Sequence, residues 1–212
     1  MLRSFVRHQV RHVEDLGGLW DFAFLGDVNA DKVKLGAIRY DDRMAVPGCF
    51  DATPKYAGKR GLAAYRLVVP VVKGAAHLLA VDGLHHWGRV FVDGQLLVEH
   101  VGGFTRFDEL FIAGGDKAEI VILADNRLDY DRCPLHLDYF DWYHYGGIAR
   151  GVELHRLGNV LIDNLAVTTT DLKSRTVKVD IDFACLDTTE SPLPLSITLD
   201  GREIHRDTVK VR

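Results

Sequence analysis

The sequence has few cysteines, no basic cluster and no long apolar run. Its three cysteines, Cys49, Cys133 and Cys185, form no CxxC pair, so neither a zinc site nor a redox motif is predicted. Lysine and arginine are scattered and the formal net charge is −4, whereas a DNA-binding protein usually shows a basic stripe. The longest apolar stretches, such as 67–72, fall far short of the roughly 20 residues of a membrane-spanning helix. We therefore expect no metal, nucleic acid or membrane partner.

Cysteine usage and the start of the chain also bear on the compartment. Three reduced, partly buried thiols are typical of a reducing environment. The first eight residues contain no apolar core of the length that a signal peptide has. A cytoplasmic protein is expected, with export after removal of a signal peptide as the alternative.

Apolar residues recur with a period of two, which is the period of strands and not of helices. The alternation is clear in residues 20–24 and again in residues 177–183. Since neighbouring side chains of a strand point to opposite faces, each run offers one apolar face to a core. Asp93-Gly94 and Asp200-Gly201 lie between apolar runs and are typical of the type I′ turn of a β-hairpin. Many short strands, Gly-rich turns and no amphipathic helix of three turns predict an all-β sandwich or barrel.

A change in composition near residues 157–159 predicts a domain boundary. Aromatic residues are dense before it, and Thr/Val-rich strands follow it. An immunoglobulin-like sandwich takes about 100 residues, so residues 158–212 are expected to form the first part of one. Such a part leaves strand edges unpaired and one apolar face uncovered. Either the native protein continues past Arg212, or another surface covers that face.

One segment, residues 137–147, combines five aromatic side chains with a central carboxylate, Asp141, and two final glycines. Sugars present C–H faces that pack on aromatic rings, and hydroxyls that bond bidentately to a carboxylate. The segment is therefore chemically suited to a sugar. The alternative is that the rings fill a core or a domain interface while Asp141 satisfies nearby backbone groups. Composition alone favours this alternative, because aromatic residues carry much of the buried area of ordinary cores.

Other polar clusters are weaker candidates. His85-His86-Trp87 could bind a ligand, but the strand pattern assigns Trp87 to a core, and adjacent histidines of a strand point to opposite faces. Asp125-Asn126-Arg127 is interpreted first as a turn, and Asp41-Asp42 as a solvated loop pair. The sequence contains no Gly-rich phosphate loop, G-x-S-x-G or HExxH, and no two carboxylates are placed as an acid and nucleophile pair. No cofactor, no metal site and no catalytic residue is predicted.

Several short motifs follow the order in which family 2 glycoside hydrolases carry them. LGGLWDF at 16–22 resembles their opening L-x-G-x-W-x-F strand, AVPGCF at 45–50 their V-P-x-x-[FW] turn, GLAAYR at 61–66 their G-x-x-W-Y-R strand, and VFVDG at 90–94 their V-x-V-N-G. EHVGGFTRF at 99–107 resembles the β-glucuronidase stretch E-H-x-G-G-[YF]-x-P-F. YFDWYHYGGI at 139–148 is similar to Y-F-D-F-x-N-Y-A-G-[LI] of the same enzymes. Each match is weak alone, but the ordered set is specific.

Four positions depart from these patterns. Ala64 stands where the family usually has Trp, Asp93 where it has Asn, and Arg106 where Pro is common. His144 stands where β-glucuronidases carry Asn. These departures concern the exact substrate more than the fold.

The resemblance implies a parent enzyme with a jelly-roll sugar-binding domain, an immunoglobulin-like sandwich and a (β/α)₈ barrel that carries both glutamates of retaining hydrolysis. Such a barrel takes roughly 250 residues. This chain is therefore expected to hold the jelly-roll domain in residues 1–157 and an incomplete immunoglobulin-like domain in residues 158–212. The Asp of the Y-F-D motif bonds hydroxyls of the terminal sugar, and that role falls on Asp141. Tyr139, Trp142 and His144 are the other expected substrate-binding residues.

Three functions remain open at this stage. The first is the non-catalytic amino-terminal part of a retaining β-glycosidase, whose partners are the terminal sugar of a β-glycoside and the missing barrel. The second is a stand-alone carbohydrate-binding module. The third is an assembly element that forms a homo-oligomer through the edge of residues 159–212. The motifs do not separate a glucuronide from a galactoside or another sugar.

Overall fold

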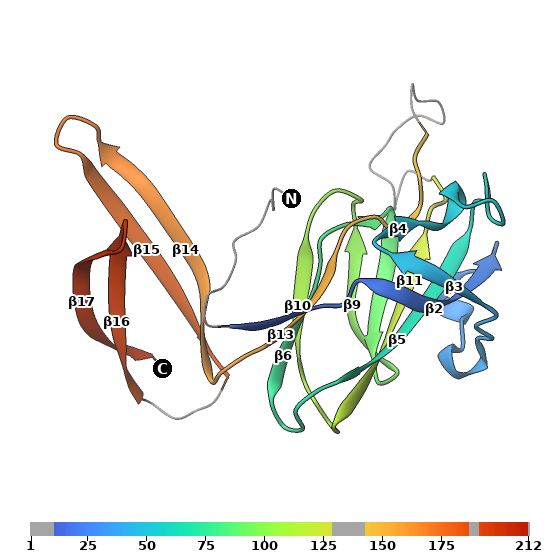
Figure 1. Ribbon diagram of the computed structural model, residues 1–212, viewed down its shortest axis with the longest axis horizontal. Coiled ribbons are helices and arrows are strands. Elements are labelled where there is room, and N and C mark those ends of the chain that lie inside the picture. The colour runs from blue at the N-terminus through green and yellow to red at the C-terminus, as the bar shows by residue number, and fades with distance from the viewer. Residues whose placement is uncertain (1–10, 129–142, 187–190, 212) are drawn as a thin grey trace. The chain divides into compact units, whose positions relative to one another are not determined.

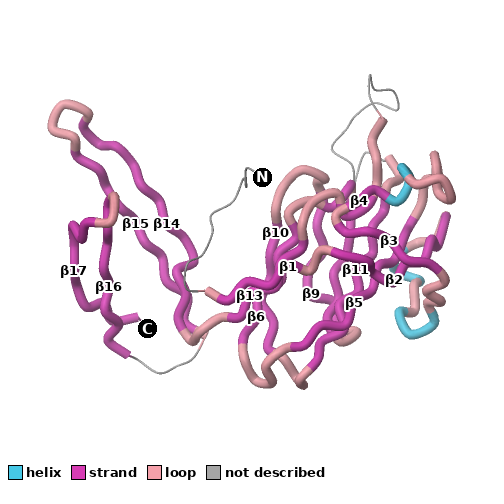
Figure 2. The backbone as a smooth tube through the Cα atoms, viewed as in Figure 1, coloured by secondary structure: helices cyan, strands magenta, loops and turns pink. Residues whose placement is uncertain are grey.

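The protein is an all-β chain, as the sequence predicts. Figure 1 shows the computed structural model, which describes residues 11–128, 143–186 and 191–211. Strands dominate this part of the chain, as Figure 2 shows, and its helices are three 3-10 turns: η1 (Ala30–Lys32), η2 (Leu35–Ala37) and η3 (Phe50–Ala52). Among the residues described, none lies in a helix with the length and apolar character that crossing a membrane takes. The chain divides into two compact units, Met1–Arg156 and Leu157–Arg212.

The first unit is a sandwich of antiparallel sheets. Its strands are β1 (His12–Asp15), β2 (Gly18–Gly26), β3 (Asp42–Val46), β4 (Gly48–Cys49), β5 (Leu62–Pro70), β6 (Ala76–Val81), β7 (Leu84–His85), β8 (Trp87–Val92), β9 (Gln95–Val101), β10 (Phe107–Ile112), β11 (Lys117–Asp125), β12 (Gly147–Ile148) and β13 (Val152–Arg156). One sheet has the order β1-β13-β6-β10 and the other β3-β2-β5-β11-β8-β9. A small sheet, β4-β12-β7, joins three short segments that are distant in sequence.

The alternation of side chains explains the core. Trp20 and Phe22 are fully buried between the two large sheets, while Asp21 between them pairs with Arg66 at 2.8 Å. Burial of an apolar side chain of this size contributes roughly 1.5–3 kcal/mol. The central strand β11 is buried on both faces. Its even-numbered apolar residues face the inner core, and Val121 and Leu123 face a second cluster under residues 25–40.

Both Asp-Gly pairs form the predicted hairpin turns. Asp93 and Gly94 have φ values of 49° and 79° between β8 and β9. Asp200 and Gly201 have φ values of 50° and 76° at the second pair. Positive φ at both central residues is the signature of a type I′ turn, which Asp-Gly adopts at low cost.

The second unit consists of two hairpins. Its strands are β14 (Val160–Asp171), β15 (Thr176–Cys185), β16 (Ser191–Leu199) and β17 (Arg202–Val211). β14 pairs with β15 and β16 with β17, in two separate two-stranded sheets. A hollow of about 890 Å³ between the hairpins is lined by apolar residues that include Phe183 and Leu195. Farther along the first hairpin, Leu165 and Val167 are 58% and 63% exposed. The described part of this unit therefore leaves much of its apolar face open.

Cys49 and Cys185 are free, half-buried thiols, and Cys133 lies outside the described residues. Burial raises the pKa of the Cys49 thiol, and the nearby Asp51 carboxylate raises it further. Cys49 therefore does not have the lowered pKa of a reactive thiolate.

Candidate functional site

The residues predicted to bind a sugar fall on or beside residues 129–142, which lie outside the described part of the chain. Tyr139, Asp141 and Trp142 belong to that stretch, so their roles stay predictions. His144 is described. The residues whose hydrogen bonds fix the backbone on either side of this stretch are described as well. These residues form the candidate site.

A buried carboxylate connects the two ends. Asp51, in η3, is 2% exposed. Its Oδ2 accepts a hydrogen bond from Asn126 Nδ2 at 2.9 Å, and its Oδ1 accepts one from the Gly146 backbone N–H at 2.9 Å. Asn126 precedes the stretch and Gly146 follows it. Hydrogen bonds to a charged acceptor contribute about 1.5–3 kcal/mol each, so Asp51 fixes these two points firmly.

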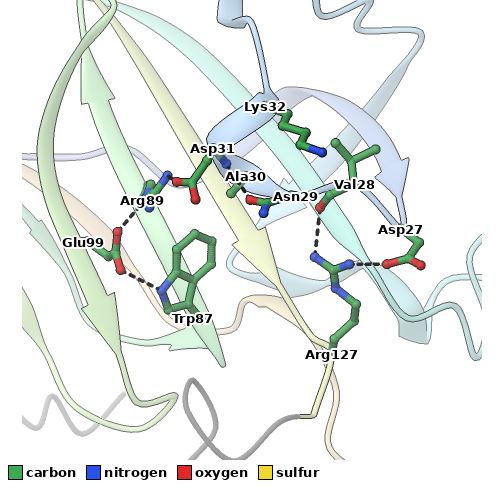
Figure 3. A pocket seen from close by; sticks show the side chains of 10 residues that line it. All are labelled: Asp27, Val28, Asn29, Ala30, Asp31, Lys32, Trp87, Arg89, Glu99 and Arg127. Carbon is green, nitrogen blue, oxygen red and sulfur yellow. Dashed lines mark hydrogen bonds and ion pairs between the residues drawn. The ribbon is translucent and has the colours of Figure 1, made fainter.

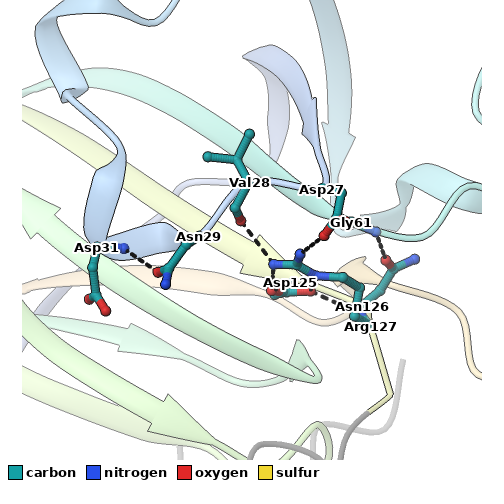
Figure 4. Close-up of polar contacts among 8 residues, drawn as sticks. All are labelled: Asp27, Val28, Asn29, Asp31, Gly61, Asp125, Asn126 and Arg127. Atoms are coloured by element: carbon teal, nitrogen blue, oxygen red, sulfur yellow. Dashed lines mark hydrogen bonds and ion pairs between the residues drawn. The ribbon is translucent and has the colours of Figure 1, made fainter.

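Asn126 is the second member of this network and is fully buried. Its Oδ1 accepts from the Gly61 N–H at 2.8 Å, as Figure 4 shows, and its Nδ2 also donates to the Lys59 carbonyl at 3.0 Å. The side-chain amide of Asn126 therefore uses both of its N–H donors and its oxygen acceptor. Among side chains of this size, the amide alone combines them in one plane.

Arg60 bonds to both ends as well. Its Nη1 donates to the carbonyl of Asn126 at 3.0 Å and to the carbonyl of His144. Its guanidinium lies 4.5 Å from the centre of the Tyr143 ring. Its Nη1 is also 3.9 Å from the Asp51 carboxylate. One side chain thus holds backbone on both sides of residues 129–142.

The two glycines at 146 and 147 are required by close packing. A Cβ on Gly146 would lie 2.1 Å from the Cβ of Asn126. Gly147 has a φ of 129°, and a Cβ there would lie 2.7 Å from the Tyr65 hydroxyl and 2.8 Å from the Gly48 carbonyl. Only glycine therefore lets the chain return past Asn126 and enter β12.

The histidines beside this network are buried. His144 is 4% exposed, and its ring lies edge-on to His86 with 5.4 Å between ring centres. His86 is 2% exposed. Burial, with smaller contributions from the nearby His85 and His144, lowers the pKa of His86 to about 4. Burial also lowers the pKa of His144, together with Arg60 and His85. The rings of His86 and His144 are therefore neutral at pH 7, and sugar binding by His144 stays a prediction.

The predicted orientation of the histidine pair is wrong. The rings of His85 and His86 stack at 5.3 Å with 10° between their planes, so they do not point to opposite faces. His86 lies between β7 and β8, and strand alternation does not apply there. Trp87 is 3% exposed, which confirms its place in a core. Within the described ranges, no three His, Cys, Asp or Glu residues are grouped so as to hold a metal ion.

Asp125 and Asp42 lie in strands and not in the turn and the loop pair predicted for them, whereas Asn126, Arg127 and the exposed Asp41 lie outside strands. Asp125 ends β11 and binds Arg127, which also bonds to Asp27 and the Val28 carbonyl (Figure 4). Asp42 begins β3 and accepts hydrogen bonds from Lys55 and Tyr56, each at 2.9 Å. These contacts lower the pKa of Asp42 to about 2, with the Lys55 bond as the largest cause.

A groove of about 680 Å³ is lined by residues 27–32 and by Trp87, Arg89, Glu99 and Arg127 (Figure 3). Arg89 reaches Glu99 at 2.6 Å and Asp31 at 2.5 Å across it, and Trp87 donates to Glu99 at 3.2 Å. These charged groups are bound to one another. The groove therefore gives no sign of a separate ligand site.

Sequence reasoning missed Asp51 and Arg60. Both lie next to quoted motifs, since Asp51 follows the 45–50 turn and Arg60 precedes the 61–66 strand. Their positions directly beside two motifs of the same family could have indicated these two residues.

Comparison with known proteins finds β-glucuronidases among the sequence relatives. No family profile matches the chain. A β-glucuronidase of Streptococcus agalactiae is 28% identical over 171 residues, which cover 69% of this chain and 28% of that protein. A β-glucuronidase of Bacteroides fragilis is 29% identical over 166 residues, covering 73% of this chain and 22% of that protein. The chain thus spans less than a third of the length of these two curated relatives.

Solved structures agree with the sequence relatives. A GH2 β-galacturonidase from Eisenbergiella tayi bound to galacturonate matches 100% of this chain and 36% of its own, with a TM-score of 0.81 and 25% identity. A Lactobacillus rhamnosus β-glucuronidase matches 97% of this chain and 38% of its own, with a TM-score of 0.74 and 25% identity. In sequence and in fold, the chain is similar to part of the length of β-glucuronidases and, in fold, to part of a GH2 β-galacturonidase, which are relatives of the kind that its ordered motifs predict.

Proposed function

We propose that the chain is the non-catalytic amino-terminal part of a retaining β-glycosidase that acts on uronides, and that it supplies Asp141 to one wall of the sugar pocket. The observation that carries this is the similarity, over most of the chain, to β-glucuronidases of which it spans less than a third. A catalytic barrel takes roughly 250 residues, more than the 212 residues of this chain in total. The acid/base and the nucleophile therefore belong to a barrel outside it.

Within this proposal, residues 1–157 are a jelly-roll sugar-binding domain. Residues 158–212 are an incomplete immunoglobulin-like domain. The partners are the terminal sugar of a β-glycoside and the catalytic barrel. The further substrate-binding residues come from the same 139–148 motif and are Tyr139, Trp142 and His144.

The buried network supports the role of Asp141. Asp51, Asn126 and Arg60 hold the residues on both sides of the stretch that carries it. Fixed ends reduce the conformational entropy that the residues between them lose when a ligand is bound. A pocket that discriminates sugars needs its polar groups held to within about 0.5 Å.

The chemistry of an aspartate fits this task. An ionised carboxylate only accepts hydrogen bonds, and its two oxygens accept from two adjacent hydroxyls of a sugar ring. It transfers no proton in this role. Asp141 would orient the terminal sugar, while the glutamates of the barrel break and form the glycosidic bond.

Two measurements test the proposal. The 212-residue chain alone should hydrolyse no chromogenic β-glucuronide, β-galacturonide or β-galactoside, because it lacks both glutamates; turnover would contradict the proposal. In a protein in which the barrel follows this chain, Asp141→Asn should lower kcat/KM for the uronide by roughly 10–100-fold, since a charged hydrogen bond is worth about 1.5–3 kcal/mol. The exposed Asp41→Asn is the matched control and should leave kcat/KM unchanged.

Calorimetry separates the stand-alone module from this proposal. If the chain alone binds glucuronate or galactose with a millimolar or lower Kd, and Asp141→Ala removes that binding, the pocket is complete without a barrel. The stand-alone function then replaces the proposed one.

A further inference from the structure

A pocket of about 300 Å³ opens at the end of the sandwich where β5 and β13 finish. All of its lining residues lie in the first unit. One wall comes from β1, β13 and β6, which are neighbours in the four-stranded sheet (Figure 2), and the other comes from residues 70–72. Its polar lining residues are His12, Glu14, His77 and Arg156.

These polar side chains lie on the face of the sheet that forms the core. Leu154 of β13 is 3% exposed in that core, and Arg156 follows two residues later on the same face. Arg156 is paired in register with His12 of β1 on one side and with His77 of β6 on the other. Polar groups between two sheets need a partner or water. The last row of the sandwich is therefore a polar row that faces the pocket.

His77 is the buried polar group of this row. It is 2% exposed and stacks on Phe111, with 5.5 Å between the ring centres and 22° between their planes. Its Nδ1 lies 3.1 Å from the Ala75 carbonyl oxygen, a contact that only a donor makes. Burial, with a smaller contribution from the charge of Arg156, lowers the pKa of His77. The ring is therefore neutral at pH 7, and Nε2 is an acceptor to which none of the described residues donates.

Arg156 and Glu14 bring opposite charges to the pocket. Arg156 is exposed and Glu14 is half-buried, and neither forms an ion pair within the described ranges. A guanidinium binds a carboxylate through two parallel N–H donors, whereas the carboxylate of Glu14 accepts from hydroxyls and repels a second carboxylate. The pocket thus offers one cationic donor and two acceptors, Glu14 and His77.

The opposite wall is apolar and fixed. The Val71 N–H donates to the Asp116 carbonyl at 3.1 Å, and the Ala75 N–H donates to the Val72 carbonyl at 3.0 Å. Val71 also packs against the main core. A wall that is already ordered loses little conformational entropy when a ligand packs against it.

We infer that this pocket binds a small hydroxy acid, a molecule with a carboxylate at one end and hydroxyl groups along a short carbon chain. Its carboxylate takes the donors of Arg156, its hydroxyls donate to His77 Nε2 and to Glu14, and its carbon chain lies against residues 70–72. The volume of about 300 Å³ is at the small end of the range of ligand pockets, which suits a short chain. The inference does not rest on the proposed function.

Three probes with the same carbon chain length test this on the 212-residue chain by NMR titration. D-Gluconate has a carboxylate and hydroxyl groups, sorbitol has hydroxyl groups alone, and hexanoate has a carboxylate alone. We expect gluconate to bind with a millimolar Kd, and the other two at least about tenfold more weakly, since each lacks one set of partners. Gluconate should also shift the nitrogen resonance of His77 Nε2, which accepts a hydrogen bond only in the complex.

Two variants remove the cation and the buried acceptor. Arg156→Gln should raise the Kd of gluconate about tenfold or more, and His77→Phe about three- to tenfold. Phenylalanine keeps a flat ring against Phe111, and the Ala75 carbonyl keeps its hydrogen bond from the Ala113 N–H at 3.1 Å. Arg39→Gln is the matched control, because Arg39 is exposed and outside the pocket, and it should leave the Kd unchanged.

The inference is overturned if the chain does not bind gluconate, if sorbitol or hexanoate binds as tightly, or if either folded variant keeps the wild-type Kd. If His77→Phe unfolds the chain, Arg156→Gln at its exposed position decides alone. Asp141→Ala should leave gluconate binding unchanged. A loss of binding in that variant would assign gluconate to the proposed sugar pocket, which overturns the inference and supports the proposed function.

Discussion

Asp51 and Asn126 lie 75 positions apart in the sequence and share a buried hydrogen bond of 2.9 Å. Through it, the η3 turn is tied to the end of β11, and the bond from Gly146 to the same carboxylate adds the start of β12. The contact is therefore the point at which three distant segments are fixed together. The stretch that contains Asp141 leaves this point and returns to it.

Asp51→Asn should lower the free energy of unfolding by about 1–3 kcal/mol, the cost of a buried donor without an acceptor. The new amide is the same size, but its NH₂ faces either the NH₂ of Asn126 or the N–H of Gly146. Urea unfolding measures the loss. Asp41→Asn, at an exposed position, is the control. Equal stabilities of the two variants would show that Asp51 does not bear on folding.

Gly147→Ala should destabilise the protein by about 2–5 kcal/mol, since overpacking costs about 1–3 kcal/mol and a left-handed φ about 1–2 kcal/mol. The φ of Gly147 is 129°, and the neighbours of a new Cβ are the Tyr65 hydroxyl at 2.7 Å and the Gly48 backbone at 2.8 Å. Gly36→Ala is the control, because nothing lies within 4 Å of a Cβ there. Thermal unfolding compares the two variants. A Gly147→Ala protein with the Tm of Gly36→Ala would contradict the packing described.

Much of the fold was predictable because it depends on local patterns. Alternation placed Trp20 and Phe22 in the core, where both are fully buried. The Asp93-Gly94 pair requires only its own backbone preferences to form a type I′ turn. The order of the motifs then predicted the kind of relative that the comparisons found, which alternation alone does not specify.

The anchoring network was not predictable in the same way. Arg60 bonds to carbonyls 66 and 84 positions away, and Asp51 to an N–H 95 positions away. No local spacing encodes such pairs, because the topology of the sheets brings them together. The stacking of His85 on His86 was mispredicted for a related reason: the strand ends between them, and the period of two ends with it.

Arg60→Lys should weaken the hydrogen bonds that fix the backbone on both sides of residues 129–142. A lysine ammonium is a compact point charge that does not stack as a planar guanidinium does, so it should not both bond to the carbonyls of Asn126 and His144 and cover Tyr143. We expect a loss of about 1–2 kcal/mol in unfolding free energy, from one or two hydrogen bonds. Thermolysin should also cut faster between residues 127 and 143, with the sites mapped by mass spectrometry.

Arg43→Lys is the control for that change, since Arg43 is 65% exposed and pairs with Asp21 at 3.4 Å. A surface pair of this kind contributes about 0–1 kcal/mol. If Arg60→Lys and Arg43→Lys resist thermolysin equally, Arg60 does not restrain the stretch.

His86 should make the protein less stable in mild acid. Burial lowers its pKa to about 4 in the folded chain, below the 6.5 of an ordinary histidine. Between these values the unfolded chain binds more protons, so the free energy of unfolding falls as the pH drops from about 6.5 to about 4, by about 3 kcal/mol in total for this group. The stability that neutral His86 contributes is thus fully present above pH 6.5. The buried His144 and His155 have lowered pKa values too and act in the same direction.

His86→Gln should therefore flatten this dependence without removing it, because glutamine has no proton to bind in this range. Urea unfolding at pH 7.5, 6.0 and 4.5 gives the slope for the wild-type chain and the variant. His205→Gln, at an exposed position of β17, should keep the wild-type slope. If His86→Gln keeps it as well, His86 takes up a proton in the folded chain as readily as in the unfolded one, and its burial beside His144 does not govern the acid sensitivity of the anchored site.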